Sequence, residues 1–207
     1  MKKIIFALLL LPALLLSSGC GSSATSKTDA PAKAPAATAN TAANASSKLT
    51  GKKVLVAYFS WGGNTKTLAE AIQKKTGGDI FRIETTTPYP TDYKACTDYA
   101  KKELADKTKP ALKAKPDFSK YDVIFLGYPN WWSNAPMPIA TLLDGAKLNG
   151  KIIVPFVTHG GGGEASTVSS MKSYAGNAKV LDALVVSGGS VGSAGSNIDA
   201  WLNKLTF

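Results

Sequence analysis

A short apolar run, a glycine turn and a helical pattern, in that order, constrain the fold of this chain more than any other feature. Residues 53–59 are mostly apolar and rich in β-branched and aromatic side chains, which predicts a buried parallel strand. Residues 66–75 place apolar side chains at helical spacing. The turn between them consists of Ser60, Trp61, Gly62, Gly63, Asn64 and Thr65. Because the first N–H groups of a helix lack partners and carry partial positive charge, this turn predicts a phosphate site built from neutral groups.

Strands and helices continue to alternate after this unit. We expect further strands at residues 79–84, 122–127, 151–157 and 180–186, and helices at residues 91–106, 138–144, 164–174 and 198–205. Continuous apolar strands separated by helices predict an α/β fold with a parallel sheet covered on both faces. In such sheets, ligands bind beyond the carboxyl ends of the strands.

Two more loops of unusual composition follow expected strands and would lie at that same edge. Counting the turn at residues 60–65 as the first loop, the second loop contains Pro129, Asn130, Trp131 and Trp132, and the third loop contains Thr158, His159, Gly160 and Gly161. Adjacent tryptophans offer flat faces to an aromatic ring, although they could instead cover the sheet edge as part of the core. Glycines let backbone N–H groups approach a polar ring edge. The three loops together predict a site for a phosphorylated planar heterocycle.

The first 50 residues differ in composition from the rest. Residues 1–19 combine a basic start with a short apolar run, which predicts a signal peptide. The small residues before Cys20 resemble a bacterial lipoprotein signal, although Ser17 stands where a leucine is usual, and an ordinary cleaved signal is the alternative. Residues 20–50 are mostly small and polar, which predicts a disordered tether before a folded domain at 51–207. We therefore expect a protein lipid-anchored through Cys20 on the extracytoplasmic side of the cell membrane.

Charge and cysteine content limit the partners. The chain carries a formal net charge of +10, and a positive excess suits an anionic ligand or an anionic membrane surface. Lysines between residues 101 and 115 are interleaved with acids and form no nucleic-acid motif, so we expect no nucleic-acid partner. Apart from Cys20, Cys96 is the only cysteine, which excludes a disulfide within the domain. We expect Cys96 to be a small buried core residue, with a reactive thiol as the alternative.

Three segments in this order resemble the flavodoxin-like family, particularly its branch on bacterial lipoproteins. They are residues 58–65, residues 121–132, and residues 150–158 with the glycines that follow. The resemblance spans residues 52–205 and implies a flavodoxin-like doubly wound sheet of five parallel strands in the order 2-1-3-4-5. It also implies that the domain binds FMN.

The resemblance assigns a role to each loop. It implies that Ser60, Asn64, Thr65 and the backbone of Gly62 and Gly63 hold the phosphate, that residues 129–132 flank the isoalloxazine, and that residues 158–161 meet its pyrimidine side. The family usually has Ser or Thr in place of Gly62, so we expect FMN retention weaker by about 1 kcal/mol. His159 stands where related sequences often have serine. It could protonate or hydrogen-bond the reduced flavin, or serve only in hydrogen bonding and packing.

These features leave three functions open. The leading hypothesis is an FMN-dependent electron-transfer lipoprotein whose partner is a redox protein or a membrane quinone. The second is an FMN-dependent quinone or NAD(P)H oxidoreductase, favoured by the basic charge and by the lack of a glycine in residues 128–138, which predict weak stabilisation of the one-electron-reduced flavin. The third is a non-catalytic ligand-binding lipoprotein. Hydrolase motifs are missing from the sequence.

Overall fold

The computed structural model of the protein describes residues 47–207. The expected signal peptide, the lipidated Cys20 and most of the expected tether lie outside the described residues. Among residues 47–207, no helix is both long enough and apolar enough to cross a membrane.

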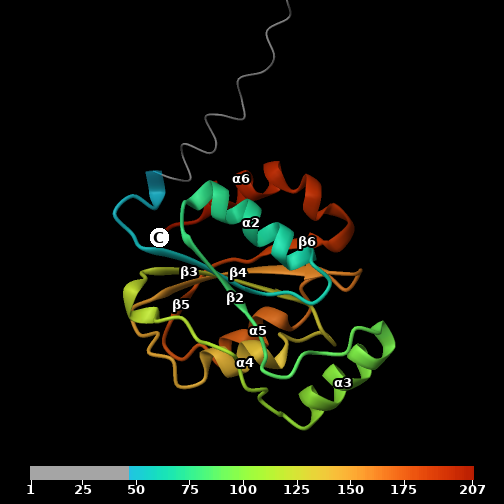
Figure 1. Cartoon of the computed structure of the whole chain (residues 1–207). Helices are drawn as coiled ribbons and strands as arrows, with labels where there is room; N and C mark the ends of the chain where they lie inside the picture. Colours follow the sequence, from blue (N-terminus) through green and yellow to red (C-terminus); the bar gives the residue numbers. More distant parts are fainter. Residues whose placement is uncertain (1–46) are drawn as a thin grey trace, which may run out of the picture. The chain divides into compact units, whose positions relative to one another are not determined.

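A single parallel sheet forms the centre of the domain (Figure 1). Its strands are β1 (Val54–Phe59), β2 (Asp79–Ile83), β3 (Val123–Pro129), β4 (Ile152–His159), β5 (Lys179–Val180) and β6 (Leu184–Ser187). The order is β2-β1-β3-β4-β5, and β6 also pairs with β4. This order confirms the doubly wound α/β sheet expected from the sequence, and it brings the carboxyl ends of β1, β3 and β4 side by side.

Helices cover both faces of the sheet. They are α2 (Asn64–Thr76), α3 (Tyr93–Ala105), α4 (Met137–Leu143), α5 (Thr167–Lys172) and α6 (Gly195–Lys204), with short 3-10 helices η1 (Phe118–Lys120) and η2 (Gly188–Ser193). Helices α2 and α6 cover one face, and α3, α4 and α5 lie on the other (Figure 1).

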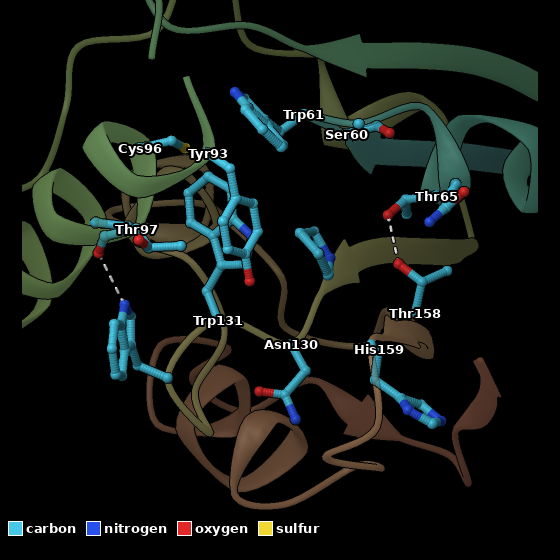
Figure 2. A pocket seen from close by; sticks show the side chains of 16 residues that line it. Ser60, Trp61, Thr65, Tyr93, Cys96, Thr97, Asn130, Trp131, Thr158 and His159 are labelled. Atoms are coloured by element: carbon cyan, nitrogen blue, oxygen red, sulfur yellow. Dashed lines mark hydrogen bonds between the residues drawn. The ribbon is translucent and has the colours of Figure 1, made fainter. Parts of the chain in front are cut away.

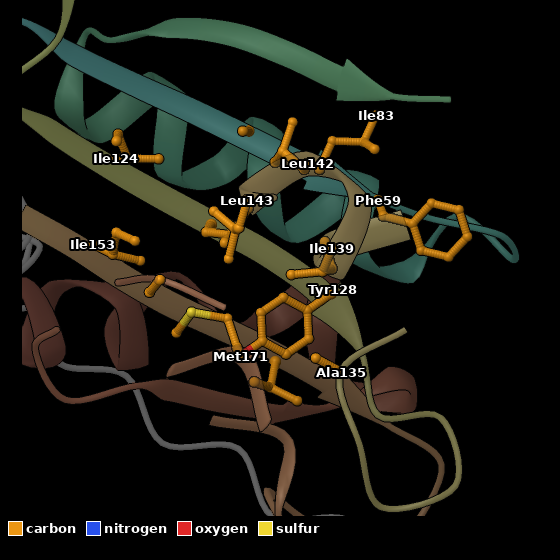
Figure 3. Close-up of a cluster of buried hydrophobic side chains, with 14 of the residues drawn as sticks. Phe59, Ile83, Ile124, Tyr128, Ala135, Ile139, Leu142, Leu143, Ile153 and Met171 are labelled. Carbon is orange, nitrogen blue, oxygen red and sulfur yellow. The ribbon is translucent and has the colours of Figure 1, made fainter. Parts of the chain in front are cut away.

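Two hydrophobic clusters fill the layers between sheet and helices. One cluster packs α2 and α6 against the sheet through side chains such as Leu68, Phe125 and Trp201. The other, drawn in Figure 3, packs α4 and α5 through Ile139 and Met171. Because the central strands are buried on both faces, their sequences are continuously apolar rather than alternating.

The fifth strand position differs from the expectation. The predicted continuous strand at 180–186 is wrong, because two short strands, β5 and β6, occupy this position and both pair with β4. Between them the Asp182 carbonyl accepts a hydrogen bond from the Trp201 indole at 2.9 Å, so it is drawn toward α6. The helix expected at 164–174 is also shorter, since Ala165 adopts a positive φ of 48° that an α-helix does not allow.

The folded domain begins earlier than residue 51. Leu49, which we expected in the tether, is buried in the core beside α2 and α6. The Nζ atom of Lys48 donates hydrogen bonds to the backbone carbonyls of Asn203 and Leu205. Residues 48–49 are therefore attached to the end of α6, and the expected start at Gly51 is a few residues late.

Candidate functional site

The first loop, residues 60–65, leads into the N-terminus of helix α2. Among residues 47–207, no side chain caps this N-terminus with a hydrogen bond. Helix α2 starts at Asn64, and the preceding Gly63 adopts a φ of 92°, which only glycine adopts without strain. The Ser60 side chain is buried, yet its hydroxyl has no hydrogen-bond partner within the described part of the chain. A buried hydroxyl beside free helical N–H groups offers hydrogen-bond donors to an anion.

Hydrogen bonds and close packing tie this loop to the other strand ends. The hydroxyls of Thr65 and Thr158 lie 2.8 Å apart, which joins α2 to the end of β4 (Figure 2). The Thr65 hydroxyl therefore has a hydrogen-bond partner within the described part of the chain, whereas the Ser60 hydroxyl has none. Gly188, which follows β6, packs against the amide of Asn64, because a Cβ added to Gly188 would lie 2.4 Å from Asn64 Nδ2.

The close approach of Gly188 to Asn64 gives a testable prediction. Gly188→Ala should displace the Asn64 amide at little cost in stability, because the clashing atom is the end of a flexible side chain. If Asn64 donates one hydrogen bond to a bound phosphate, FMN affinity should fall about fivefold. The measurement is an FMN titration followed by flavin fluorescence. Gly189→Ala is the matched control, since its added Cβ meets nothing within 4 Å; equal affinities in both variants would contradict the role of Asn64.

The second loop, which follows β3, contains a tight turn at residues 131–134. Trp131 and Asn134 exchange backbone hydrogen bonds of 3.1 and 3.0 Å, and the two residues between them, Trp132 and Ser133, have φ values of 53° and 63°. Positive φ at both central positions is costly for residues other than glycine. The surrounding contacts must therefore hold this turn in place.

Those contacts give the two tryptophans different environments. Trp131 is half-buried and packs edge-on against Phe59 at 5.3 Å and Tyr89 at 5.1 Å between ring centroids. Trp132 is 46% exposed, its indole N–H donates to the Thr97 carbonyl at 2.9 Å, and the Lys101 ammonium lies 4.8 Å from its ring. Trp131 is thus partly core and Trp132 is held at the surface, yet both line the same cavity.

The third loop is shaped by its own backbone. The Nδ1 atom of His159 accepts a hydrogen bond of 3.0 Å from the Gly161 N–H. Nδ1 is then an acceptor, so a neutral His159 ring carries its proton on Nε2. The Asn130 backbone N–H donates to the Thr158 carbonyl at 2.7 Å, and its side chain donates to the Gly163 carbonyl at 2.9 Å. These bonds join the second and third loops.

The three loops surround one cavity of about 510 Å³ at the carboxyl edge of the sheet (Figure 2). Of the residues expected from the sequence, the structure places around it Ser60, Trp61, Gly62, Asn64, Thr65, Pro129, Asn130, Trp131, Trp132, Thr158, His159 and Gly160. Gly63 and Gly161 shape the loops but do not line the cavity. None of the lining residues is a lysine, arginine, aspartate or glutamate, so an anion here would be held by neutral donors.

One wall of the cavity comes from α3 and was not expected. It consists of Tyr93, Cys96, Thr97 and Ala100, which share one face of the helix. Tyr93 is 72% exposed and stands 6.2 Å from Trp61 between ring centroids. Cys96 is 2% exposed, which confirms its expected burial, and burial together with the nearby Glu103 raises the pKa of its thiol. Its spacing with Ala100 is the same for a core face and for a cavity wall, so the sequence could not distinguish them.

A buried acid lies behind this wall. Glu103 is 5% exposed, the Tyr89 hydroxyl donates to its Oε2, and its Oε1 has no partner among residues 47–207. Burial raises the pKa of the Glu103 carboxyl, and the bond from Tyr89 opposes that shift only in part. Because Tyr89 packs against Trp131, this acid supports the aromatic wall from behind.

The raised pKa of Glu103 predicts a pH dependence of stability. Since the folded protein keeps this proton at a higher pH than the unfolded chain, the stability that the group contributes falls as pH rises above its ordinary pKa. Glu103→Gln cannot ionise. Its loss of unfolding free energy relative to the unmodified protein should therefore be smaller at about pH 7.5 than at about pH 4.5. Urea unfolding at both pH values measures this, and an equal loss at both would contradict the raised pKa.

The fold and the site together define a class of protein. A doubly wound parallel sheet with an uncapped helix N-terminus, aromatic side chains and a glycine loop at its carboxyl edge is the architecture of nucleotide-binding α/β proteins. The sequence model of the family described as Flavodoxin matches residues 53–205. The chain belongs to the flavodoxin family.

Solved structures agree with this assignment. A candidate flavoprotein from Bacteroides eggerthii DSM 20697 is 34% identical with a TM-score of 0.66, and the match covers 74% of this chain and 97% of the other. A flavoprotein from Lactobacillus acidophilus NCFM, in complex with FMN, is 26% identical with a TM-score of 0.59, covering 69% and 98%. A candidate flavoprotein from Bacteroides uniformis ATCC 8492 is 26% identical with a TM-score of 0.66, covering 75% and 100%. No functionally curated protein matches the chain significantly.

Proposed function

We propose that this protein binds FMN in the cavity at the carboxyl edge of its sheet and transfers electrons through it. The observation that carries the proposal is the meeting of three loops around one neutral cavity, with the unpartnered Ser60 hydroxyl beside the N-terminus of α2. The related flavoprotein from Lactobacillus acidophilus in complex with FMN supports the choice of ligand.

The residues present fit FMN from the phosphate to the ring. Ser60, Asn64 and the first N–H groups of α2 would hold the phosphate as uncharged donors. Trp131 and Trp132 would flank the isoalloxazine, and the loop from Thr158 to Gly160 would meet its polar edge. FMN, when bound, supplies the redox chemistry. The lining residues would orient it, and the residues of α3 that line the cavity would limit the access of water to it.

We further propose that the protein works at the outer face of the cytoplasmic membrane, attached by lipid on Cys20. The signal-like residues 1–19 and the polar segment that follows support this location. Its electron partner would then be a membrane quinone or another redox protein. Cys20→Ala should leave the processed protein without the mass of a lipid and release it from the membrane fraction. A variant that keeps the lipid mass and stays in the membrane fraction would contradict the anchor.

The exposed aromatic rim favours a second candidate function. Trp61, Tyr93 and Trp132 are all exposed at the cavity, and they offer stacking faces to a planar substrate beside the flavin. A quinone or NAD(P)H oxidoreductase would use such a surface. Anaerobic mixing of the FMN-loaded domain with NADH, NADPH or a reduced quinone separates electron transfer from NAD(P)H oxidoreductase activity. Electron transfer predicts fast bleaching of the flavin absorbance with the quinol alone, and fast bleaching with a nicotinamide would favour the reductase.

A further inference from the structure

The positive charge of the domain gathers at the edge of the sheet opposite the cavity. In a parallel sheet, all strands start at one edge, and here lysines stand at or near those starts. We call this the basic edge and define it by Lys52, Lys53, Lys120, Lys147, Lys151 and Lys179. Lys52, Lys53 and Lys120 also line a groove of about 710 Å³ between the start of β1 and the end of α2.

Few lysines of the basic edge are paired with an acid, although Lys151 and Lys179 donate hydrogen bonds to the backbone carbonyls of Ser119 and Thr206. Among the described residues, only Lys120 of this set forms an ion pair, with Asp117 at a long 4.0 Å. Three aspartates also lie near this edge and keep their negative charge, but among the described residues none of the three forms an ion pair with a lysine of this set. Asp122 accepts the backbone N–H of Lys53 at 2.8 Å, Asp144 pairs with Lys109 at 2.9 Å, and Asp79 accepts the Tyr121 hydroxyl at 2.9 Å.

Fewer lysines lack an acidic partner at the opposite end of the domain. Several lysines of α3 and α2 pair with acids one turn away, as in Lys66 with Glu70 and Lys94 with Asp98, both at 2.6 Å. Lys102 pairs with Asp106 in the same way. Lysines without an ion pair are therefore more numerous at the basic edge than beside the cavity, where Lys101 lies against the Trp132 ring.

The chain also enters the domain at the basic edge. Leu49 lines the same groove as Lys52 and Lys53, and Lys48 is bonded to the last residues of α6, beside the C-terminus marked in Figure 1. Residues 21–46 would thus connect the proposed anchor at Cys20 to this edge.

We propose that the basic edge docks on an anionic phospholipid surface and turns the cavity away from the membrane. Lysines spread along the starts of several strands suit a broad anionic surface better than a single small ligand. Lysine stems and their mobile ammonium groups reach headgroup phosphates without a fixed geometry. This proposal builds on the proposed membrane location and adds an orientation to it: the flavin site opens toward partners on the side remote from the lipid.

The test uses residues 47–207 alone, because solved relatives that consist almost entirely of this domain show that it folds by itself. The fragment should sediment with vesicles of phosphatidylglycerol and phosphatidylcholine at low salt, and not with phosphatidylcholine alone. The combined variant Lys53→Gln/Lys120→Gln/Lys147→Gln should weaken binding by about tenfold or more. The matched control, Lys102→Gln/Lys107→Gln/Lys113→Gln, loses the same charge away from the edge and should change binding by less than about threefold.

The orientation has its own readout. Cys96 is buried, so a single introduced cysteine can be labelled selectively in this fragment. A fluorophore at Asn149→Cys, near the basic edge, should transfer energy to a headgroup acceptor more efficiently than one at Asp98→Cys on α3. Absence of vesicle binding, equal losses in both lysine variants, the reverse order of transfer, or binding to acidic polypeptides or oligonucleotides without vesicle binding would each overturn the proposal. The fragment lacks Cys20 and the measurement needs no flavin, so such a failure is distinct from failure of the anchor or of FMN binding.

Discussion

Gly127→Ala is expected to lower the free energy of unfolding by about 3 kcal/mol or more. Gly127 lies in the central strand β3, where it pairs with Phe156 of β4. A Cβ at this position would lie 2.0 Å from the Phe156 ring, and both residues are in the buried interior. The ring is fully enclosed, so it cannot move aside without disturbing close-packed neighbours. Urea unfolding of the purified domain measures the loss.

Three further variants show whether the clash is the cause. Gly192→Ala adds the same methyl group where nothing lies within 4 Å, and it should change stability by less than about 1 kcal/mol. Phe156→Leu removes the ring atoms that the new Cβ would meet. The double variant Gly127→Ala/Phe156→Leu should therefore lose clearly less stability than the sum of the two single variants. Additive losses would show that the ring is not what excludes a side chain at residue 127.

Riboflavin is expected to bind the domain about a hundredfold more weakly than FMN. The two ligands share the ring and differ in the phosphate, which we place at Ser60 and the N-terminus of α2. Two hydrogen bonds to a charged group are worth about 3 kcal/mol together, which is about a hundredfold in affinity. Parallel titrations with the two flavins, followed by ring fluorescence, measure the ratio.

A single hydroxyl variant locates the phosphate within the cavity. Ser60→Ala should reduce the preference for FMN over riboflavin by about tenfold, while leaving riboflavin affinity nearly unchanged. Ser190→Ala, at an exposed serine of η2, is the control and should keep the full preference. Equal affinity of the unmodified domain for both flavins would show that the cavity does not bind the phosphate of FMN.

Local sequence signals were sufficient to locate most strands and helices along the chain, whereas the strand order 2-1-3-4-5 was implied by the resemblance to the flavodoxin-like family. Buried parallel strands must be apolar on both faces, so β1, β3 and β4 stand out as continuous apolar runs. The sequence did not predict that two short strands, β5 and β6, occupy the fifth strand position. The break between them depends on the hydrogen bond from the Trp201 indole of α6 to the Asp182 carbonyl. Contacts between distant elements leave no periodic signal in the segment that they alter.

The loops of the candidate site could be predicted from the sequence, but the parts of the site contributed by other elements could not. Its loops follow strands, and their glycines, tryptophans and hydroxyls are unusual enough to be recognised beside β1, β3 and β4. The wall of α3 was missed because Cys96 and Ala100 look the same whether a helix faces a core or a cavity. Gly188 was missed because its role, leaving room for the Asn64 amide, is set by a neighbour more than a hundred residues earlier in the chain.

Titration of the purified domain with FMN shows whether the cavity is a flavin site. We expect saturable binding of one FMN per chain, with quenching of flavin fluorescence by the tryptophans around the cavity and a yellow protein that keeps its colour through gel filtration. A domain that folds normally, as judged by circular dichroism, but elutes colourless and leaves FMN fluorescence unchanged would contradict it.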